Sequence, residues 1–312
     1  MRKRLCNMNY NIVIIGSSNT DMVVRTHHLP APGETVLGGS FLMGQGGKGA
    51  NQAVAVKRLA KDEKVTFISK VGTDVFGENA LKQYASEKLD ISGIMRSTSP
   101  SGVALIAVDD IGENSIIVAS GANADWSEKD IEEHRTEIEN ADILLLQLEI
   151  PMPAVLKAAK IASEAGVFVV LNPAPYIELP KELYHYISLI IPNETEMSMM
   201  VASEINNETD VIESVQKLTA LGVENVIVTL GSKGSLVMCE GQTKFIPARK
   251  VQALDTTAAG DTFCAGVCVA LAEGKNLFDA AQFATCASSL AVQKVGAQDS
   301  IPFRAEVDEL NY

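Results

Sequence analysis

The sequence lacks an excess of positive charge. Its 26 lysines and arginines are outnumbered by 39 aspartates and glutamates, which leaves a net charge of −13. A protein that binds nucleic acid regardless of base sequence needs a basic stripe, so the composition argues against that class of partner. A nucleotide site is still allowed, because a few local donors are enough to hold a phosphate.

Cysteines are few and do not form a recognisable pairing pattern. The five thiols are Cys6, Cys239, Cys264, Cys268 and Cys286, an odd number without a C-x-x-C motif. This predicts free thiols in a reducing compartment. Cys264 and Cys268 are four residues apart on an expected helix, a spacing that fits two core thiols better than a metal pair.

Long hydrophobic runs are also missing. No stretch reaches the roughly 18 apolar residues that a membrane span requires. The basic start "MRKR" is followed only by "IVIIG", shorter than the roughly 7–15 apolar residues of a signal peptide. We therefore expect a cytoplasmic protein with no membrane contact.

What the sequence does contain is an alternation of strand and helix patterns. Of its 312 residues, 46% are hydrophobic, enough for a large core. Short apolar runs at 11–16, 65–69, 141–149, 167–172, 189–193 and 225–231 are separated by amphipathic stretches, of which 127–138 is expected to be one helix. This pattern predicts an α/β fold with a mostly parallel sheet covered by helices on both faces.

Two early segments, 33–43 and 102–119, do not follow the alternation. Each reads as an antiparallel pair of strands. We therefore expect a small β-sheet lid of residues 22–45 and 101–122 beside an α/β body. The body is expected to comprise residues 1–21, 46–100 and 123–312.

The stretch "GQGGKGAN" (44–51) satisfies G-x-G-x-x-G, but neither common nucleotide loop fits it. A dinucleotide site needs a clear strand before it and an acid about 20 residues on, and a Walker A loop needs Ser or Thr where Gly49 stands. A glycine turn that admits a ligand, with Lys48 and Asn51 pointing at it, fits better. A tight helix start with an exposed lysine is equally supported.

The stretch "DTTAAGDTF" (255–263) places a carboxylate beside a predicted helix start. Free N–H groups at a helix N-terminus attract an anion. Asp261 could be an ordinary first-turn acid, which stabilises a helix by about 0.3–1 kcal/mol. It could instead take a proton from an alcohol while the neighbouring N–H groups hold a transferring phosphoryl group.

Polar residues also follow the other predicted strands, where ligands of open α/β sheets collect. In "NETE", Asn193 and Glu196 share one face of a helix start and offer the oxygen ligands that Mg²⁺ prefers. On this stretch alone, a helix cap by Asn193 is the stronger interpretation. Asp255, six residues before Asp261, could cap a turn or hold a cation.

These stretches, together with "GSSNTDMV", "LNPAP", "VTLGSKG" and "VGAQDSIP", carry a resemblance. From about residue 10 to 305 the chain resembles the ribokinase-like carbohydrate kinases. The resemblance implies a three-layer α/β fold with a β-sheet lid. It also implies ATP-dependent phosphorylation of D-ribose at the 5-hydroxyl, giving D-ribose 5-phosphate and ADP, a step of ribose catabolism. The alternatives are a sister kinase for a nucleoside, fructose or a deoxy sugar, and a sugar-binding regulator without catalysis.

The resemblance also assigns roles by position. Asp261 is the implied catalytic base, with an anion hole of backbone N–H groups from Ala258, Ala259 and Gly260. The implied sugar contacts are Asn19, Asp21, Gly47, Lys48, Asn51, Glu149 and Asp261. The implied ATP contacts are Asn193, Thr229, Gly231, Ser232, Lys233, Gly234, Gly260 and Thr285, a position where the family often has His or Asn. Asn193 and Glu196 are implied to act around Mg²⁺, through water.

A monovalent cation, K⁺, is implied beside the anion hole. Its ligands would be mostly backbone oxygens, with side chains from Asp255 and Ser300; the matching positions are Asp255, Thr257, Ala291, Lys294, Gly296 and Ser300. The lid is expected to close over the sugar, to exclude water from the reaction and to form the contact of a homodimer.

Overall fold

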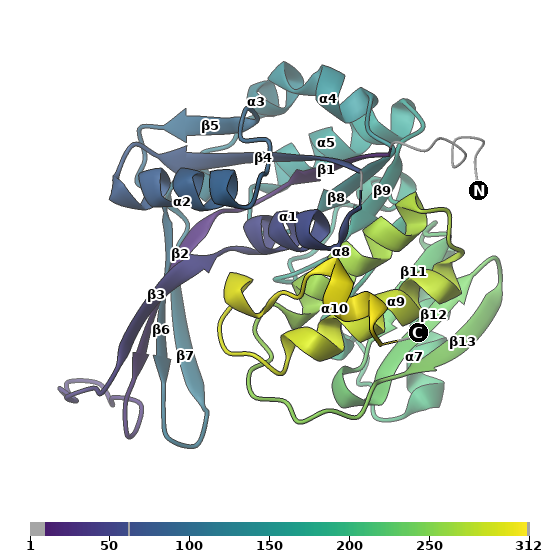
Figure 1. Cartoon of the computed structure of the whole chain (residues 1–312). Coiled ribbons are helices and arrows are strands. Elements are labelled where there is room, and N and C mark those ends of the chain that lie inside the picture. Colours follow the sequence, from purple (N-terminus) through teal and green to yellow (C-terminus); the bar gives the residue numbers. More distant parts are fainter. Residues whose placement is uncertain (1–9, 62, 311–312) are drawn as a thin grey trace.

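Two β-sheets organise the computed structural model, which describes residues 10–61 and 63–310 (Figure 1). The larger sheet has nine strands in the order β13-β12-β11-β10-β9-β8-β1-β4-β5. The strands from β5 to β11 pair in parallel, and β12 and β13 add an antiparallel edge. The strands are β1 Asn11–Ile15, β4 Lys64–Gly72, β5 Ile94–Ser97, β8 Ile143–Leu146, β9 Phe168–Leu171, β10 Leu189–Ile190, β11 Asn225–Thr229, β12 Gly234–Cys239 and β13 Gln242–Pro247.

The central strands β8, β9 and β10 are apolar at every position, and β1 is apolar after Asn11, because helices bury both faces of the sheet. In β1, Ile12 and Ile14 pack into one core cluster, and Val13 and Ile15 pack into the other. The first cluster is completed by α1 Lys48–Leu59, α2 Val75–Ser86, α8 Ala259–Ala272, α9 Leu277–Ala291 and α10 Arg304–Asp308. The second is completed by α3 Glu128–Glu133, α4 Arg135–Glu139, α5 Met152–Glu164, α6 Glu194–Val201 and α7 Glu208–Ala220.

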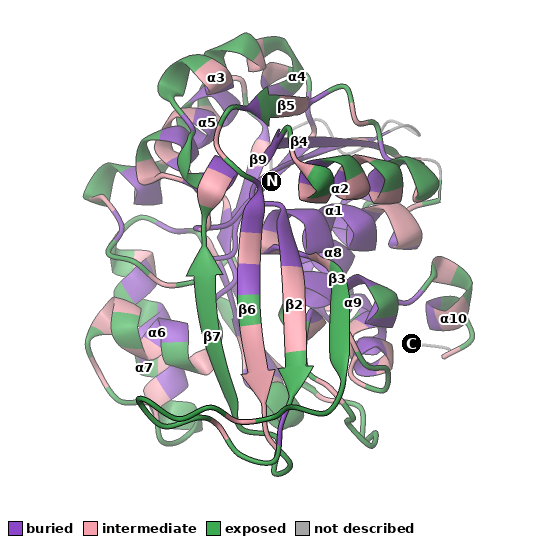
Figure 2. Cartoon of the chain, turned by 90° about the vertical axis from the view of Figure 1, so that its left-hand side faces the viewer, coloured by how far each residue is buried: buried purple, intermediate pink, exposed green. Residues whose placement is uncertain are grey.

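The second sheet has four strands in the order β3-β2-β6-β7 and projects from the side of the larger one (Figure 1). Its strands are β2 Asn19–Arg25, β3 Phe41–Gly46, β6 Gly102–Val108 and β7 Asn114–Ala119. β2 and β6 pair in parallel, and each forms an antiparallel hairpin with its edge strand. Burial falls from the body towards the tip of this sheet, and β7 is exposed along its whole length (Figure 2).

The fold class is confirmed, and two local predictions are wrong. Residues 33–40 contain no strand; they connect β2 to β3, and β3 pairs with β2 instead of within 33–43. The polar start of β2, at Asn19, hid its strand character. The stretch 127–138 is two helices that meet at His134. Ile131 and Ile138 keep a helical spacing across that break, so the sequence pattern gave no sign of it.

No helix among the described residues is long and apolar enough to cross a lipid bilayer. Of the cysteines in the described part of the chain, Cys239, Cys264, Cys268 and Cys286 are free thiols, as predicted. Cys6 lies outside the described residues.

Candidate active site

The first part of the site is a close contact between the end of β1 and the start of α1. A Cβ atom on Gly49 would lie 2.5 Å from both the carbonyl carbon of Gly16 and the nitrogen of Ser17. The Ala50 N–H donates to the Ser17 carbonyl at 2.9 Å. The glycines of "GGKGAN" thus allow the helix start to pack directly against the strand end.

Glu149, at the end of β8, joins this contact from the neighbouring strand. Its Oε2 accepts the N–H of Lys48 at 2.9 Å and the hydroxyl of Ser17. Gly47 is the N-terminal cap residue of α1. Three of the predicted sugar contacts, Gly47, Lys48 and Glu149, therefore meet at one point.

Asp261 lies in the first turn of α8 and is buried. Its Oδ2 accepts from Asn51 Nδ2, and its Oδ1 accepts from Gln52 Nε2, both at 3.0 Å. The structure therefore brings Asp261 together with Asn51, 210 residues away in the chain. Burial raises the pKa of Asp261, against the opposing effects of Lys48 and of these two amides.

Asn19 is held by a residue for which the sequence suggested no role, Asn123. Asn123 Nδ2 donates to Asn19 Oδ1 at 2.7 Å and to the Ser18 carbonyl at 3.0 Å, and its Oδ1 accepts the Ser18 N–H at 2.9 Å. Asn123 lies in the turn Gly121–Ala124, where the four-stranded sheet returns to the body. In the sequence, Asn123 stands in the stretch "GANA" (121–124), which by itself indicates no function.

Gly102 leaves the room that this asparagine pair needs. A Cβ there would lie 2.2 Å from Asn19 Oδ1 and 2.3 Å from Asn123 Nδ2. We expect Gly102→Ala to displace Asn19 and to raise the KM for the sugar about tenfold, because losing one well-made polar contact costs about 1–3 kcal/mol. Steady-state kinetics would measure this. Gly39→Ala is the control, since its nearest neighbour would be 3.9 Å away; equal KM values for the two variants would contradict the prediction.

Acidic groups crowd this part of the site. Burial, followed by the charges of Glu149 and Asp261, raises the pKa of Asp21 to about 6. Burial alone would lower the pKa of Lys48, but the negative charges of Asp261, Glu149 and Glu196 outweigh it and raise that pKa. The ammonium of Lys48 is therefore protonated. The carboxylates around it are hydrogen-bond acceptors, which suit a ligand with several hydroxyl donors.

The N-terminus of α8 opens beside Asp261. Among the described residues, the N–H groups of Ala258 and Gly260 make no hydrogen bond, and a Cβ on Gly260 would meet nothing within 4 Å. The Ala259 N–H instead donates to the Thr256 carbonyl at 3.2 Å in the turn that starts the helix. Two of the three predicted amides are thus available to an anion, and helix N-termini favour anions.

The predicted cation loop lies next to this turn. Asp255 Oδ1 accepts the N–H of Thr257 at 2.9 Å and its hydroxyl at 2.6 Å, and Asp255 Oδ2 accepts the N–H of Gly296 at 2.9 Å. Burial raises the pKa of Asp255, but these hydrogen bonds outweigh it and hold the pKa below its usual value. In its ionised form, Asp255 therefore links the turn at Thr257 to the loop at Gly296.

The other predicted cation positions lie in the same stretch. α9 ends at Ala291, whose carbonyl accepts from the N–H of Lys294 at 3.1 Å. Ser300 is fully buried in the turn Gln298–Ser300, and its hydroxyl donates to the Ala297 carbonyl at 2.8 Å. Carbonyl, hydroxyl and carboxylate oxygens are the donors that a hard cation takes, so the residues present fit K⁺.

Asn193 and Glu196 form the helix cap that the sequence had left as one alternative. Asn193 Oδ1 accepts the N–H of Glu196 at 2.7 Å, and Glu196 Oε2 accepts the N–H of Asn193 at 2.8 Å. Glu196 is buried, and that burial raises its pKa. The cap uses only Oε2 of Glu196, so the second carboxylate oxygen is left to accept from a metal-bound water. This arrangement fits Mg²⁺. No group of three or more His, Cys, Asp or Glu among residues 10–61 and 63–310 is placed to hold a metal.

The predicted nucleotide residues follow β11. Thr229 ends that strand, Gly231, Ser232 and Lys233 form the next turn, and Gly234 opens β12. The Lys233 ammonium lies 3.2 Å from Glu194 on the surface. Thr285 of α9 is buried, and its hydroxyl donates to the Ala281 carbonyl of its own helix at 2.8 Å.

A cavity of about 360 Å³ lies between the four-stranded sheet and the body. Asn123 and Glu149 line it from the body side, and Asn19 at the start of β2 and Val118 of β7 line it from the sheet side. Since Asn19 and Glu149 are both predicted sugar contacts, this space adjoins the sugar side of the site.

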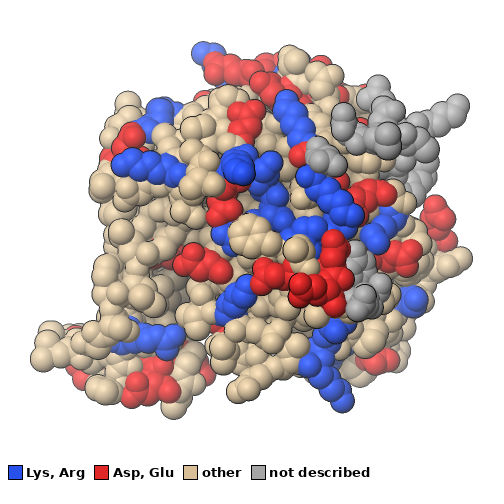
Figure 3. Space-filling view, in the orientation of Figure 1, with Lys and Arg blue, Asp and Glu red and all other residues tan. Residues whose placement is uncertain are grey.

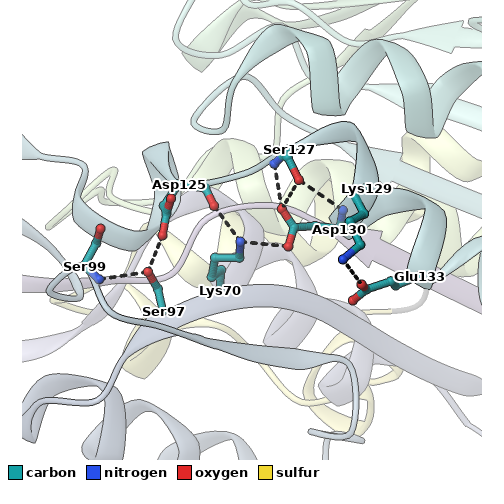
Figure 4. A network of polar contacts seen from close by, with 8 residues as sticks. All are labelled: Lys70, Ser97, Ser99, Asp125, Ser127, Lys129, Asp130 and Glu133. Atoms are coloured by element: carbon teal, nitrogen blue, oxygen red, sulfur yellow. Dashed lines mark hydrogen bonds and ion pairs between the residues drawn. The ribbon is translucent and has the colours of Figure 1, made fainter.

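A second polar network anchors the returning end of the four-stranded sheet (Figure 4). The buried Lys70 of β4 donates to the Asp125 carbonyl at 2.5 Å and to Asp130 Oδ1 at 2.9 Å. Asp125 in turn accepts the hydroxyl of Ser97 through its side chain. Asp125 directly follows the turn that carries Asn123. This network therefore fixes the end of the turn from which Asn123 contacts Asn19.

Comparison with known proteins identifies the family of this chain. Residues 9–304 match the pfkB family carbohydrate kinases. The chain belongs to this family.

Relatives of this carbohydrate kinase cover almost its full length. A ribokinase of Haemophilus influenzae is 42% identical over 97% of this chain and 98% of its own. A deoxyribokinase of Salmonella typhi is 32% identical over 96% of this chain and 98% of its own. The structure of Arabidopsis thaliana ribokinase complexed with ribose and ATP matches with a TM-score of 0.89 at 34% identity, covering 97% of this chain and 99% of that chain.

Proposed function

We propose that this carbohydrate kinase transfers the γ-phosphoryl group of ATP to the 5-hydroxyl of D-ribose, giving D-ribose 5-phosphate and ADP. The observation that carries the proposal is the position of Asp261. It is buried between amides of the sugar side and the open N-terminus of α8. The high identity to a ribokinase, against the lower identity to a deoxyribokinase, supports ribose as the acceptor.

In this reaction Asn19, Asp21, Lys48, Asn51 and Glu149 orient the sugar hydroxyls. Asp261 accepts the proton of the 5-hydroxyl, and the freed electron pair of that oxygen forms the bond to the γ-phosphorus. The bond from phosphorus to the bridging oxygen of ADP breaks, and the electron pair leaves with ADP. The N–H groups of Ala258 and Gly260 hold the charge on the transferring group.

The nucleotide lies along the turn after β11 in this proposal, with Thr229, Gly231, Ser232, Lys233, Gly234 and Thr285 beside it. Glu196, positioned by Asn193, would hold Mg²⁺ through water. Magnesium, when bound, supplies charge neutralisation to the ATP phosphates. Asn193 acts indirectly, by positioning Glu196 in the helix cap, because its side-chain oxygen already accepts the N–H of Glu196.

A monovalent cation in the loop of Asp255 would brace the start of α8 and offset charge on the transferring group. We expect higher activity in K⁺ than in Na⁺, and the lowest activity in tetramethylammonium, which is too large for the loop. Initial rates at constant ionic strength would measure this. Asp255→Asn should reduce the difference in rate between the salts. Equal rates of the unaltered protein in all three salts would contradict the proposed cation site.

The four-stranded sheet is proposed to be the lid that closes over the sugar, comprising residues 22–45 and 101–122, with the remaining chain as the body. Val118 already lines the cavity beside Asn19 and Glu149. Closure would keep water, a competing acceptor, away from the phosphoryl group.

The outer face of this lid is the proposed homodimer contact. Side chains alternate along a strand, so the face opposite Asp21 carries a row in register: Met43, Met22, Leu105 and Ile117. Met43, Leu105 and Ile117 are 50–67% exposed. Uncharged residues cover most of the lid above its charged tip (Figure 3). An exposed apolar face of this kind marks a protein–protein contact.

We expect Ile117→Lys to convert the dimer into monomers, because it would bury a charge in the contact. Light scattering coupled to size-exclusion chromatography measures the mass. Ile111→Lys is the matched control, since Ile111 is 85% exposed in the turn between β6 and β7 and off this face. A monomeric unaltered protein would contradict the proposal.

The decisive test of function is an ADP-release assay with ribose, 2-deoxyribose, fructose and adenosine as acceptors. Sites that bind a hydroxyl through buried polar groups can reject an analogue lacking it by about 10⁴-fold, so ribose should be clearly preferred. A preference for another acceptor would select the sister kinase, and ribose binding without ADP release would select the regulator. The free thiols favour a reducing compartment, which supports a cytoplasmic location.

A further inference from the structure

Three buried carboxamide side chains lie behind Asp261, and the proposed reaction gives them no role. Gln52 belongs to α1, Gln147 follows β8 and Asn172 follows β9; none is more than 8% exposed. Gln147 Nε2 donates to Gln52 Oε1 at 2.6 Å. Gln52 Nε2 donates to Asn172 Oδ1 at 3.1 Å and to Asp261 Oδ1 at 3.0 Å. The three side chains thus form a continuous hydrogen-bonded chain that ends on the proposed base.

A backbone carbonyl sets the direction of this chain. Asn172 Nδ2 donates to the Ile191 carbonyl at 3.0 Å. A carbonyl oxygen can only accept, so the amide nitrogen of Asn172 has to face it, and Oδ1 has to face Gln52. Gln52 must then present its NH₂ group, whose two hydrogens serve Asn172 and Asp261. A reversed Gln52 would set its oxygen against two acceptors.

The consequence for Asp261 is that its two oxygens differ. Oδ1 accepts from Gln52, on the side of the strand ends, and Oδ2 accepts from Asn51, a proposed sugar contact. Hydrogen bonds to a carboxylate favour its charged form over the protonated one. Gln52 is held at both ends by Asn172 and Gln147, so its donor stays on Oδ1. Asn51 Oδ1 has no hydrogen-bond partner among the described residues, so Asn51 is free to turn its amide towards the sugar and to leave Oδ2 for the sugar proton.

We propose that Gln52, oriented by Asn172 and Gln147, is a positioning residue that occupies Oδ1 of Asp261, so that the base stays ionised and takes the substrate proton on Oδ2. The inference rests on the proposed function, which makes Asp261 the base. Gln52 does not touch the sugar in this arrangement; it acts through Asp261.

Other ionisable groups also act on Asp261, and they come from several elements. Lys48 of α1 favours its charged form, and Glu149 after β8 opposes it. Asp21 of β2, Glu196 of α6 and the Cys264 thiol of α8 interact with it electrostatically as well. A substitution of Gln52 leaves all of these groups in place, so a change in the pH profile reports the lost amide contact.

The test is the pH dependence of ribose phosphorylation by Gln52→Met, which keeps the length of the side chain and removes both donors. Without a donor to Oδ1, the pKa of Asp261 should rise, so the acidic limb of kcat should move to higher pH by about one unit. A one-unit shift changes the ionised fraction up to about tenfold. We expect kcat to fall by up to about tenfold on the acidic side of this limb and to recover as the pH is raised, while the KM for ribose changes less than about threefold.

Asn172→Ala is the second variant, and it decides the outcome if Gln52→Met does not fold. It keeps the contact between Gln52 and Asp261 but removes the group that orients Gln52, so the limb should shift in the same direction by a smaller amount. Ser214→Ala is the control: it removes a buried hydroxyl from α7, which bonds only within its own helix, and the pH profile should not change.

An unshifted acidic limb in Gln52→Met, or a loss of activity by the same factor at every pH, would overturn the positioning role. The same two results in Asn172→Ala would overturn it if that variant has to decide. Failure of the unaltered protein to phosphorylate ribose is a different result, and it would remove the proposed function itself.

Discussion

Asp261→Asn is expected to lower kcat by about 10²–10⁴-fold while ribose still binds, because a carboxamide cannot take the proton of the attacking hydroxyl. Asn51 and Gln52 both donate to Asp261, so the substituted amide would also face an N–H group with its own NH₂. Steady-state kinetics measures kcat, and calorimetry measures ribose affinity. A variant that turns over at nearly the normal rate would exclude Asp261 as the base.

Asp279→Asn is the matched control for this experiment. Asp279 is also a first-turn aspartate, in α9, where its N–H and carboxylate bond to the cap residue Asn276. If Asp261 only stabilised its helix, both substitutions would cost about 0.3–1 kcal/mol of stability and leave kcat unchanged. If Asp261 is the base, Asp261→Asn should lower kcat strongly and Asp279→Asn should not.

The second large effect is expected from Gly49→Ala. Alanine is ordinarily about 1 kcal/mol better than glycine inside a helix. Here the added Cβ would lie 2.5 Å from backbone atoms of Gly16 and Ser17, which cannot rotate away as a side chain can. Separating α1 from β1 should cost about 3 kcal/mol, at the upper end of overpacking effects. It should also displace Lys48 and Asn51 and so weaken ribose binding.

Urea denaturation monitored by circular dichroism measures the loss of stability. Gly39→Ala, which meets no close neighbour, should change the unfolding free energy little. If Gly49→Ala proved as stable as the unaltered protein, the close approach of α1 to β1 would be wrong, and the geometry of the sugar side with it.

The sequence also carried features whose use it could not decide. Asn193 and Glu196 offered either a cap or a metal site, and the structure shows the cap, which uses one of the two carboxylate oxygens of Glu196. The polar start of β2 gave no strand signal, and its partner β3 begins only at Phe41, after a connection without strands.

The sequence by itself determined the alternating α/β architecture, the buried central strands and the helix start that carries Asp261, because periodicity and helix-start signals are local properties of the chain. Only the tertiary structure decided which side chains meet. Gln52 reaches Asp261 across 209 residues and Asn172 across 120, and Asn123 reaches Asn19 across 104. Those contacts follow from the order of strands in the sheet, and strand order is set by packing between distant segments, which no local pattern records.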